Sequence, residues 1–135
     1  MNMQLNSTPA DSELRSVEPR GFLDHDRTIP ALVIVDELVA RTYRMPRSAL
    51  YADTRCRKTV AFARQVAMYL AHVSLSYPLK QIAGHYGRDR TTVAYACRVV
   101  EDRREEEETE LLINSLESAL ETMMLITPLT CRRSK

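Results

Sequence analysis

Glycine and cysteine are scarce in this 135-residue chain, and each shortage excludes a class of protein. Three glycines cannot build the glycine-rich loops that cradle nucleotide phosphates. The three cysteines, Cys56, Cys97 and Cys131, are odd in number and far apart, which argues against a disulfide framework and against a cysteine-based zinc site. We therefore expect reduced thiols, no metal or other cofactor, and no nucleotide hydrolysis.

Long apolar runs are also missing. The longest, such as residues 31–35, fall far short of the roughly 18 residues that a membrane-spanning helix needs. The N-terminus lacks the basic and then apolar order of a signal peptide, so we expect a cytoplasmic protein without a membrane partner. The three histidines and the possible nucleophiles are too scattered to predict a metal site or a catalytic arrangement, and we expect no enzyme activity.

The charges that are present are sorted along the chain. Residues 55–104 hold ten basic residues and three acidic ones, whereas residues 105–121 hold seven glutamates and no basic residue. A local excess of positive charge is typical of a surface that meets polyphosphate, although surface arginines also serve simply to keep proteins soluble. The composition, 44% hydrophobic and 27% charged, fits one compact domain with tails.

Hydrophobic periodicity predicts an all-α fold, a small helical bundle. We expect a disordered tail over residues 1–28, a helical domain over 29–104, an acidic amphipathic helix over 105–127 and a basic tail over 128–135. Within the domain the pattern predicts helices at 29–43, 60–74 and 79–86, a loop at 45–57, and a long helix from about residue 90 that continues through the glutamates. Pro128 is expected to end the last helix.

Residues 79–93 have the features of a helix-turn-helix. Ala83 is small enough for a close helix crossing, Gly87 suits a turn with positive φ, and Val93 would lock the second helix onto the first. Asp89 is a plausible N-cap for that second helix. The outward residues at its start and along its length are Arg88, Asp89, Arg90, Thr91, Thr92, Tyr95 and Arg98.

This position suits DNA recognition, because a recognition helix meets base edges in the major groove with its N-terminal turns. Arginine can bond guanine, threonine can contact thymine, and aspartate can accept from cytosine. The bland alternative is an ordinary helical hairpin whose polar residues only cap and solvate it. A GxxG match at residues 84–87 would suggest the RNA-binding KH fold, but that fold requires strands that the sequence does not predict.

Two blocks of sequence make the interpretation specific. Arg64-Gln-Val-Ala-Met-Tyr-Leu70 and Arg88-Asp-Arg-Thr-Thr-Val-Ala-Tyr-Ala-Cys-Arg98 resemble the C-terminal DNA-binding domain of the bacterial replication initiator family DnaA. That family has Arg-Gln-Val-Ala-Met-Tyr-Leu and Arg-Asp-His-Thr-Thr-Val, followed by Ala-Cys-Arg. The chain differs in having Arg90 in place of the histidine, one glycine in the turn instead of two, and Cys56 at the position of a loop arginine.

The resemblance implies that Asp89, Thr91 and Thr92 touch bases, that Arg64 and Gln65 hold phosphates, and that an arginine of the basic loop enters the minor groove. Together with the outward face described above, it gives two sets of candidate residues. Those for base contact are Arg88, Asp89, Arg90, Thr91, Thr92 and Tyr95. Those for phosphate or minor-groove contact are Arg55, Arg57, Lys58, Arg64, Gln65, Lys80 and Arg98.

The sequence thus predicts a protein that binds double-stranded DNA and regulates transcription or the initiation of replication in a bacterium, close to the nucleoid. The alternative is a protein-interaction module that lost DNA binding and uses its acidic C-terminal helix. That helix itself has three interpretations: a solvated surface, a surface for a homodimer or a protein partner, or an acidic guard that competes with DNA. Tyr69, Met123 and Met124 are expected to pack in the core or an interface.

Overall fold

The computed structural model of the chain describes residues 29–52 and 57–131, with side chains up to residue 126. The predicted tail at 1–28, residues 132–135 of the predicted tail at 128–135, and Arg55 and Cys56 in the basic loop lie outside the described residues. The elements are α3 (Pro30–Thr42), the 3₁₀ helix η1 (Arg47–Tyr51), α4 (Lys58–Tyr69), the π turn η2 (Leu70–Ser74), α5 (Leu79–Tyr86), α6 (Arg90–Arg103) and α7 (Glu107–Cys131). The part of the chain described here contains no strand, and the all-α prediction is confirmed.

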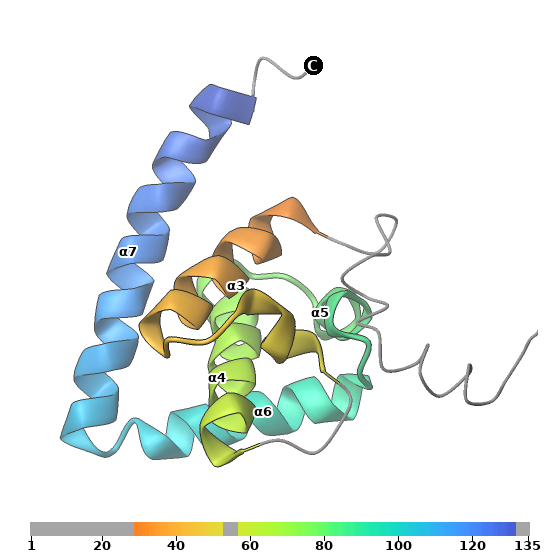
Figure 1. Cartoon of the computed structure of the whole chain (residues 1–135), viewed down its shortest axis with the longest axis vertical. Coiled ribbons are helices and arrows are strands. Elements are labelled where there is room, and N and C mark those ends of the chain that lie inside the picture. Colours follow the sequence, from red (N-terminus) through yellow and green to blue (C-terminus); the bar gives the residue numbers. More distant parts are fainter. Residues whose placement is uncertain (1–28, 53–56, 132–135) are drawn as a thin grey trace, which may run out of the picture.

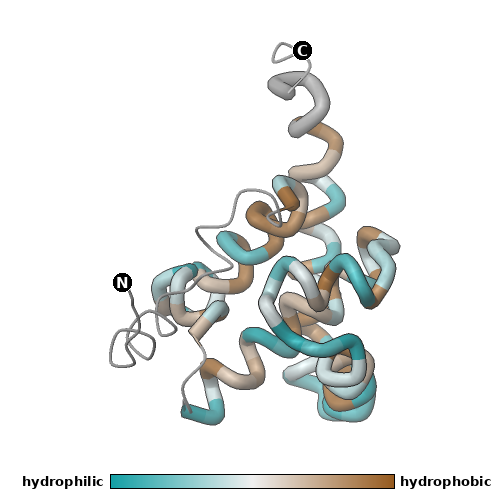
Figure 2. Tube along the Cα trace, turned by 90° about the vertical axis from the view of Figure 1, so that its right-hand side faces the viewer, coloured by the Kyte–Doolittle hydropathy of each residue, from teal (hydrophilic) through white to brown (hydrophobic). Residues whose placement is uncertain are grey.

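Helix α4 is the centre of the bundle, and α3, η1 and α6 pack against it (Figure 1). Ala63, Val66 and Ala67 are fully buried because they recur at helical spacing along its inner face. Hydrophilic and hydrophobic residues alternate along the helices in Figure 2, which is the pattern of amphipathic helices that share one core. None of the helices in the described ranges is long and apolar enough to span a membrane.

The helix-turn-helix consists of α5 and α6. Gly87 ends α5 in the left-handed conformation, with φ 66° and ψ 38°. The N–H of Arg88 donates to the carbonyl of Ala83 at 2.9 Å, which is the bond that closes a glycine-capped helix end. Val93 then anchors α6, since it is fully buried in the core. The predicted roles of the turn glycine and of this anchor therefore agree with the structure.

The structure differs from the sequence prediction in the loop and at one cap. The expected loop at 45–57 contains a short 3₁₀ helix, η1, because Leu50 and Tyr51 are apolar enough to turn inward and are buried. Asp89 stands at the N-cap position of α6, but its side chain makes no capping hydrogen bond.

A second group of differences concerns the C-terminal helix. Helix α6 does not continue through the glutamates: the chain turns at residues 104–106, and α7 begins at Glu107. The corner is held by Arg104, whose guanidinium bonds Glu110 at 2.7 Å and Glu117 at 3.1 Å across the turn. Helix α7 also continues through Pro128 to Cys131. A proline inside a helix removes one N–H bond and crowds the carbonyl four residues earlier, which weakens the helix at that point without always ending it.

Candidate nucleic-acid interface

The start of α6 presents an exposed polar surface. Its exposed members are Asp89, Arg90, Thr91, Thr92 and Tyr95, hereafter the recognition surface, and Tyr95 is 56% exposed. The opposite face of α6 holds the helix in place, because Val93, Ala96 and Val100 are buried. The helix therefore offers polar side chains to a ligand without removing any of them from the core.

The predicted phosphate-binding residues of α4 lie beside this surface. A hollow of about 160 Å³ lies between α4 and α6, which pack against each other. It is lined by Ala61, Arg64, Gln65 and Met68 from α4 and by Arg88, Thr92, Tyr95 and Ala96 from the turn and α6. The two sequence blocks that begin at Arg64 and Arg88, 24 residues apart in the chain, thus meet on one surface.

Arg64 and Arg88 both bond the backbone at the end of η1. Arg64 Nε donates to the carbonyl of Leu50 at 2.8 Å, and Arg88 Nη2 donates to the carbonyl of Ala52 at 2.6 Å. Arg64 Nη2 reaches the same Ala52 carbonyl at 3.4 Å. These two guanidiniums therefore fix the chain immediately before the basic loop. Their contacts with phosphate and base stay predictions.

The remaining candidate cations in the described ranges are exposed. Arg57 and Lys58 stand at the start of α4, Lys80 lies on α5 and Arg98 lies on α6. Arg98 is eight residues after Arg90 on the same helix, about 12 Å along its axis. Both α4 and α5 pack against α6, and exposed cations on elements that adjoin a recognition helix can position a protein on a phosphate backbone.

A buried polar cluster connects α3, η1 and α5, and the sequence analysis did not identify it. The carboxylate of Asp36 accepts hydrogen bonds from the hydroxyls of Tyr51 and Tyr86 and bonds Nε2 of His85 at 2.8 Å. The backbone N–H of Ile29 donates to Nδ1 of the same histidine at 3.2 Å. His85 is therefore the tautomer with its proton on Nε2, and all four side chains are at most 4% exposed.

Burial and charge keep both tyrosines of this cluster protonated. Burial raises the pKa of Tyr51 and of Tyr86 well above the ordinary value, and the neighbouring Asp36 carboxylate raises both further. Each hydroxyl can therefore act as a donor to Asp36 across the accessible pH range. The cluster fixes the first helix of the helix-turn-helix to α3, and it is a structural support, not a surface that a ligand could reach.

Helix α7 packs its apolar face on the bundle. Ile113, Leu116 and Leu120 are buried against the core, and Met123 and Met124 are half-buried. Arg104 adds polar contacts, since its Nη1 also donates to the hydroxyl of the buried Tyr69 at 2.9 Å.

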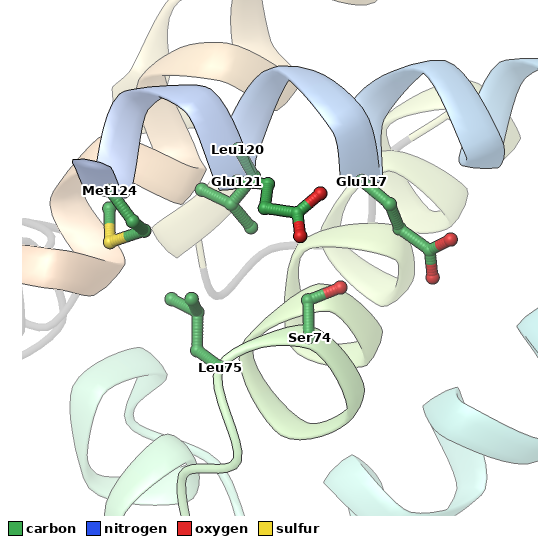
Figure 3. Close-up of a pocket in the computed structure, with 6 residues that line it drawn as sticks. All are labelled: Ser74, Leu75, Glu117, Leu120, Glu121 and Met124. Carbon is green, nitrogen blue, oxygen red and sulfur yellow. The ribbon is translucent and has the colours of Figure 1, made fainter. Parts of the chain in front are cut away.

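A pocket of about 310 Å³ lies between α7 and the end of η2. Figure 3 shows Leu75, Leu120 and Met124 at one end of this pocket, while the carboxylate of Glu121 extends toward Ser74. Glu117 also lines it. Two carboxylates beside an apolar wall would repel phosphate, so this pocket is not part of the candidate nucleic-acid interface. Among the described residues, no three His, Cys, Asp or Glu side chains gather where they could hold a metal ion.

The region that forms this surface is similar to known proteins. Residues 34–100 match the family described as bacterial dnaA protein helix-turn-helix. The chain is 39% identical over 88 residues to the chromosomal replication initiator protein DnaA of Psychromonas ingrahamii, covering 61% of this chain and 19% of that protein. It is 33% identical over 123 residues to DnaA of Nitrobacter hamburgensis, covering 84% of this chain and 25% of the relative. The chain thus spans a quarter or less of the length of these relatives.

Proposed function

The chain belongs, through residues 34–100, to the family of bacterial DnaA helix-turn-helix domains, and on that premise we propose that it binds double-stranded DNA with the start of α6 in the major groove. The observation that carries the proposal is the recognition surface. Five polar side chains project from the first turns of α6, while the buried face of the same helix fixes their direction. This is the geometry that base-edge contact requires.

The chemistry of the surface agrees with sequence-specific binding. Arg90 can donate two hydrogen bonds to guanine, Thr91 and Thr92 each offer a hydroxyl and a methyl group, and Asp89 can accept from cytosine. The exposed cations, among them Lys58 and Arg98, would contact phosphates and set the register. Arg64 and Arg88 bond the backbone that leads into the basic loop, and so they help to hold that loop beside the recognition surface.

Substitutions at two positions test the division between base and phosphate contacts. Thr91→Ala should weaken binding to the preferred duplex by about 1–3 kcal/mol and change binding to unrelated duplexes much less. Lys58→Ala should weaken binding to all duplexes alike and reduce the salt slope by about 1. Fluorescence anisotropy with single-site duplexes measures both quantities.

The matched control is Ser74→Ala, which removes an exposed hydroxyl from η2. Its affinity should equal that of the unmodified chain. A Thr91→Ala loss of the same size on every duplex would contradict the assignment of this residue to base recognition.

We further propose that binding serves regulation, either of transcription or of replication initiation at sites like those of the initiator, and that the chain acts on the nucleoid by binding alone, without catalysis. The relatives are chromosomal replication initiator proteins, which supports the second role. Mapping the bound sites across the genome distinguishes the two, because replication control predicts sites clustered at the origin and transcription control predicts sites at promoters.

A second candidate function is protein interaction through α7. Leu111, Leu125 and Ile126 favour it, since they are between 54% and 74% exposed. A salt titration separates the candidates: DNA affinity should fall steeply with salt if several phosphates are contacted. Failure to bind duplex DNA at low salt would favour an interaction module.

A further inference from the structure

Arg88 connects three elements of the bundle at the turn of the helix-turn-helix. Its backbone N–H donates to the carbonyl of Ala83 on α5 at 2.9 Å. Its guanidinium Nη2 donates to the carbonyl of Ala52, at the end of η1, at 2.6 Å. Helix α6 begins two residues later, at Arg90. The residue that precedes the recognition surface is therefore bonded to α5 through its backbone and to the end of η1 through its side chain.

The start of α6 depends on this bond because its own cap is incomplete. Asp89 occupies the N-cap position, but its side chain makes no capping hydrogen bond. A side-chain cap normally helps to fix the first turn of a helix. Here the bond from Arg88 to Ala52 ties the chain just before α6 to the bundle, and Arg64 Nη2 reaches the same carbonyl from α4 at 3.4 Å. The carbonyl of Ala52 is therefore a shared point of attachment for α4 and for the turn before α6.

Arg88 and Arg90 differ in what their guanidiniums can bond. Arg88 is half-buried, its Nη2 is bonded to Ala52, and its Nε is buried. Nε and Nη2 form one of the guanidinium edges that can make two parallel hydrogen bonds to guanine or phosphate, and in Arg88 this edge faces the protein. Arg90 is exposed, and its side chain makes no hydrogen bond or ion pair with the described residues. Of the two arginines, Arg90 is therefore the one placed to bond a base.

We infer that Arg88 is a positioning residue, which holds the start of α6 against η1 so that the recognition surface meets DNA in a fixed orientation, and that Arg90 is the arginine that bonds a base. This inference deepens the DNA binding proposed above and rests on it. A positioning residue affects all base contacts of α6 together, because it changes the placement of the helix and not a single contact. A base-contacting residue affects one base pair, and a phosphate-contacting residue affects all duplexes and the salt slope.

Binding of Arg88→Met to a panel of duplexes separates these three roles. The panel consists of the preferred duplex and its single-base-pair variants, and fluorescence anisotropy measures each affinity. Arg88→Met should weaken binding to the preferred duplex by about fivefold or more, since one charge-assisted hydrogen bond that orients α6 is lost. The affinity ratios within the panel should stay within about twofold of those of the unmodified chain, and the salt slope should not change. The control Arg41→Met, which removes an exposed arginine from α3, should bind as the unmodified chain does.

A matched pair of lysine variants distinguishes positioning from base contact. A lysine can donate the single bond to Ala52, but it cannot make the paired bonds of a guanidinium. Arg88→Lys should therefore bind the whole panel within about threefold of the unmodified chain, whereas Arg90→Lys should lose discrimination at one base pair. Circular dichroism shows whether Arg88→Met remains folded. If it does not, the Arg88→Lys panel decides alone, because a loss of discrimination confined to one base pair would overturn the inference.

Hydrogen exchange of the full chain without DNA tests the anchor separately from the proposed function. Arg88→Met should speed amide exchange at Thr92, in the first turn of α6, and at Ala52, whereas Arg88→Lys should not. The inference would be overturned by unchanged exchange or unchanged affinity of Arg88→Met, by an altered ratio at a single base pair, or by a salt slope reduced by about 1. If the unmodified chain bound no duplex while the exchange result held, the proposed function would fail, and with it the role of Arg88 in DNA binding, but not the anchor.

Discussion

The carboxylate of Asp36 should be among the largest single contributors to stability in the described part of the chain. Asp36→Ala removes the acceptor of three buried donors: the hydroxyls of Tyr51 and Tyr86, and Nε2–H of His85. Nε2–H of His85 keeps the Tyr51 hydroxyl oxygen as an acceptor at 3.2 Å, whereas the two tyrosine hydroxyls lose theirs. Each donor left without a partner in a buried site costs about 1–2 kcal/mol, so the two together cost about 2–4 kcal/mol. Since domains of this size are stable by about 5–15 kcal/mol, the variant should lose a large part of its stability.

Urea unfolding followed by far-ultraviolet circular dichroism measures this loss. The matched variant is Tyr86→Phe, which removes one donor and keeps the carboxylate with its other two partners, at an expected cost of about 1–2 kcal/mol. Combining Tyr86→Phe with Asp36→Ala should cost less than the two losses added, because the double variant no longer buries an unsatisfied Tyr86 hydroxyl. The expected coupling is about 1 kcal/mol or more.

Strict additivity, or an Asp36→Ala loss below about 1 kcal/mol, would refute the role assigned to the cluster. Either result would mean that water reaches these donors in solution, or that the hydrogen bonds contribute little over those made in the unfolded chain. The burial of Asp36 and His85, 0% and 1% exposed, makes access of water the less expected of the two.

Two further predictions concern the turn and the corner of the bundle. Gly87→Ala should lower the free energy of unfolding by about 1–2 kcal/mol, because its φ of 66° disfavours any residue with a Cβ. The added Cβ would meet no neighbour within 4 Å, so no steric clash adds to this loss. A loss measured by urea unfolding that is absent, or that exceeds about 3 kcal/mol, would contradict this explanation. At the corner, the bond from Arg104 lowers the pKa of Glu110, so this pair stabilises the fold above the ordinary pKa of the carboxyl group and loses its effect as the pH falls through the lowered value. Arg104→Gln should therefore lower Tm at neutral pH and make it less sensitive to acid, and an unchanged pH profile would contradict the pairing.

The parts of the fold that depend on local pattern could be predicted from the sequence. Apolar residues at helical spacing located α3 to α6, and Gly87 marked the turn because only a glycine adopts its φ without strain. The break at residues 104–106 was not predicted, because it depends on Arg104 meeting Glu110 and Glu117 across the corner. Such bonds arise from tertiary placement and leave no periodic signal.

The Asp36 cluster also depends on contacts between distant parts of the chain, which local pattern does not predict. Asp36 and His85 are 49 residues apart, so no local spacing relates them. A signal was nevertheless present: Asp36 lies midway between Leu32 and Ala40, four residues from each, on the buried stripe of α3. An acidic residue on an apolar stripe needs a buried partner. Charge counting predicted a basic region around residues 55–104, but it could not show that Arg64 and Arg88 donate to backbone carbonyls.

The recognition surface contributes little to the free energy of unfolding. Asp89, Arg90, Thr91 and Thr92 are all exposed, whereas the residues that hold α6 in place, Val93, Ala96 and Val100, point the other way. Sequence preference can therefore drift, or be redesigned, by exchanging residues 89–92 at little thermodynamic expense. A library randomised at these four positions should yield mostly folded proteins with altered target sites.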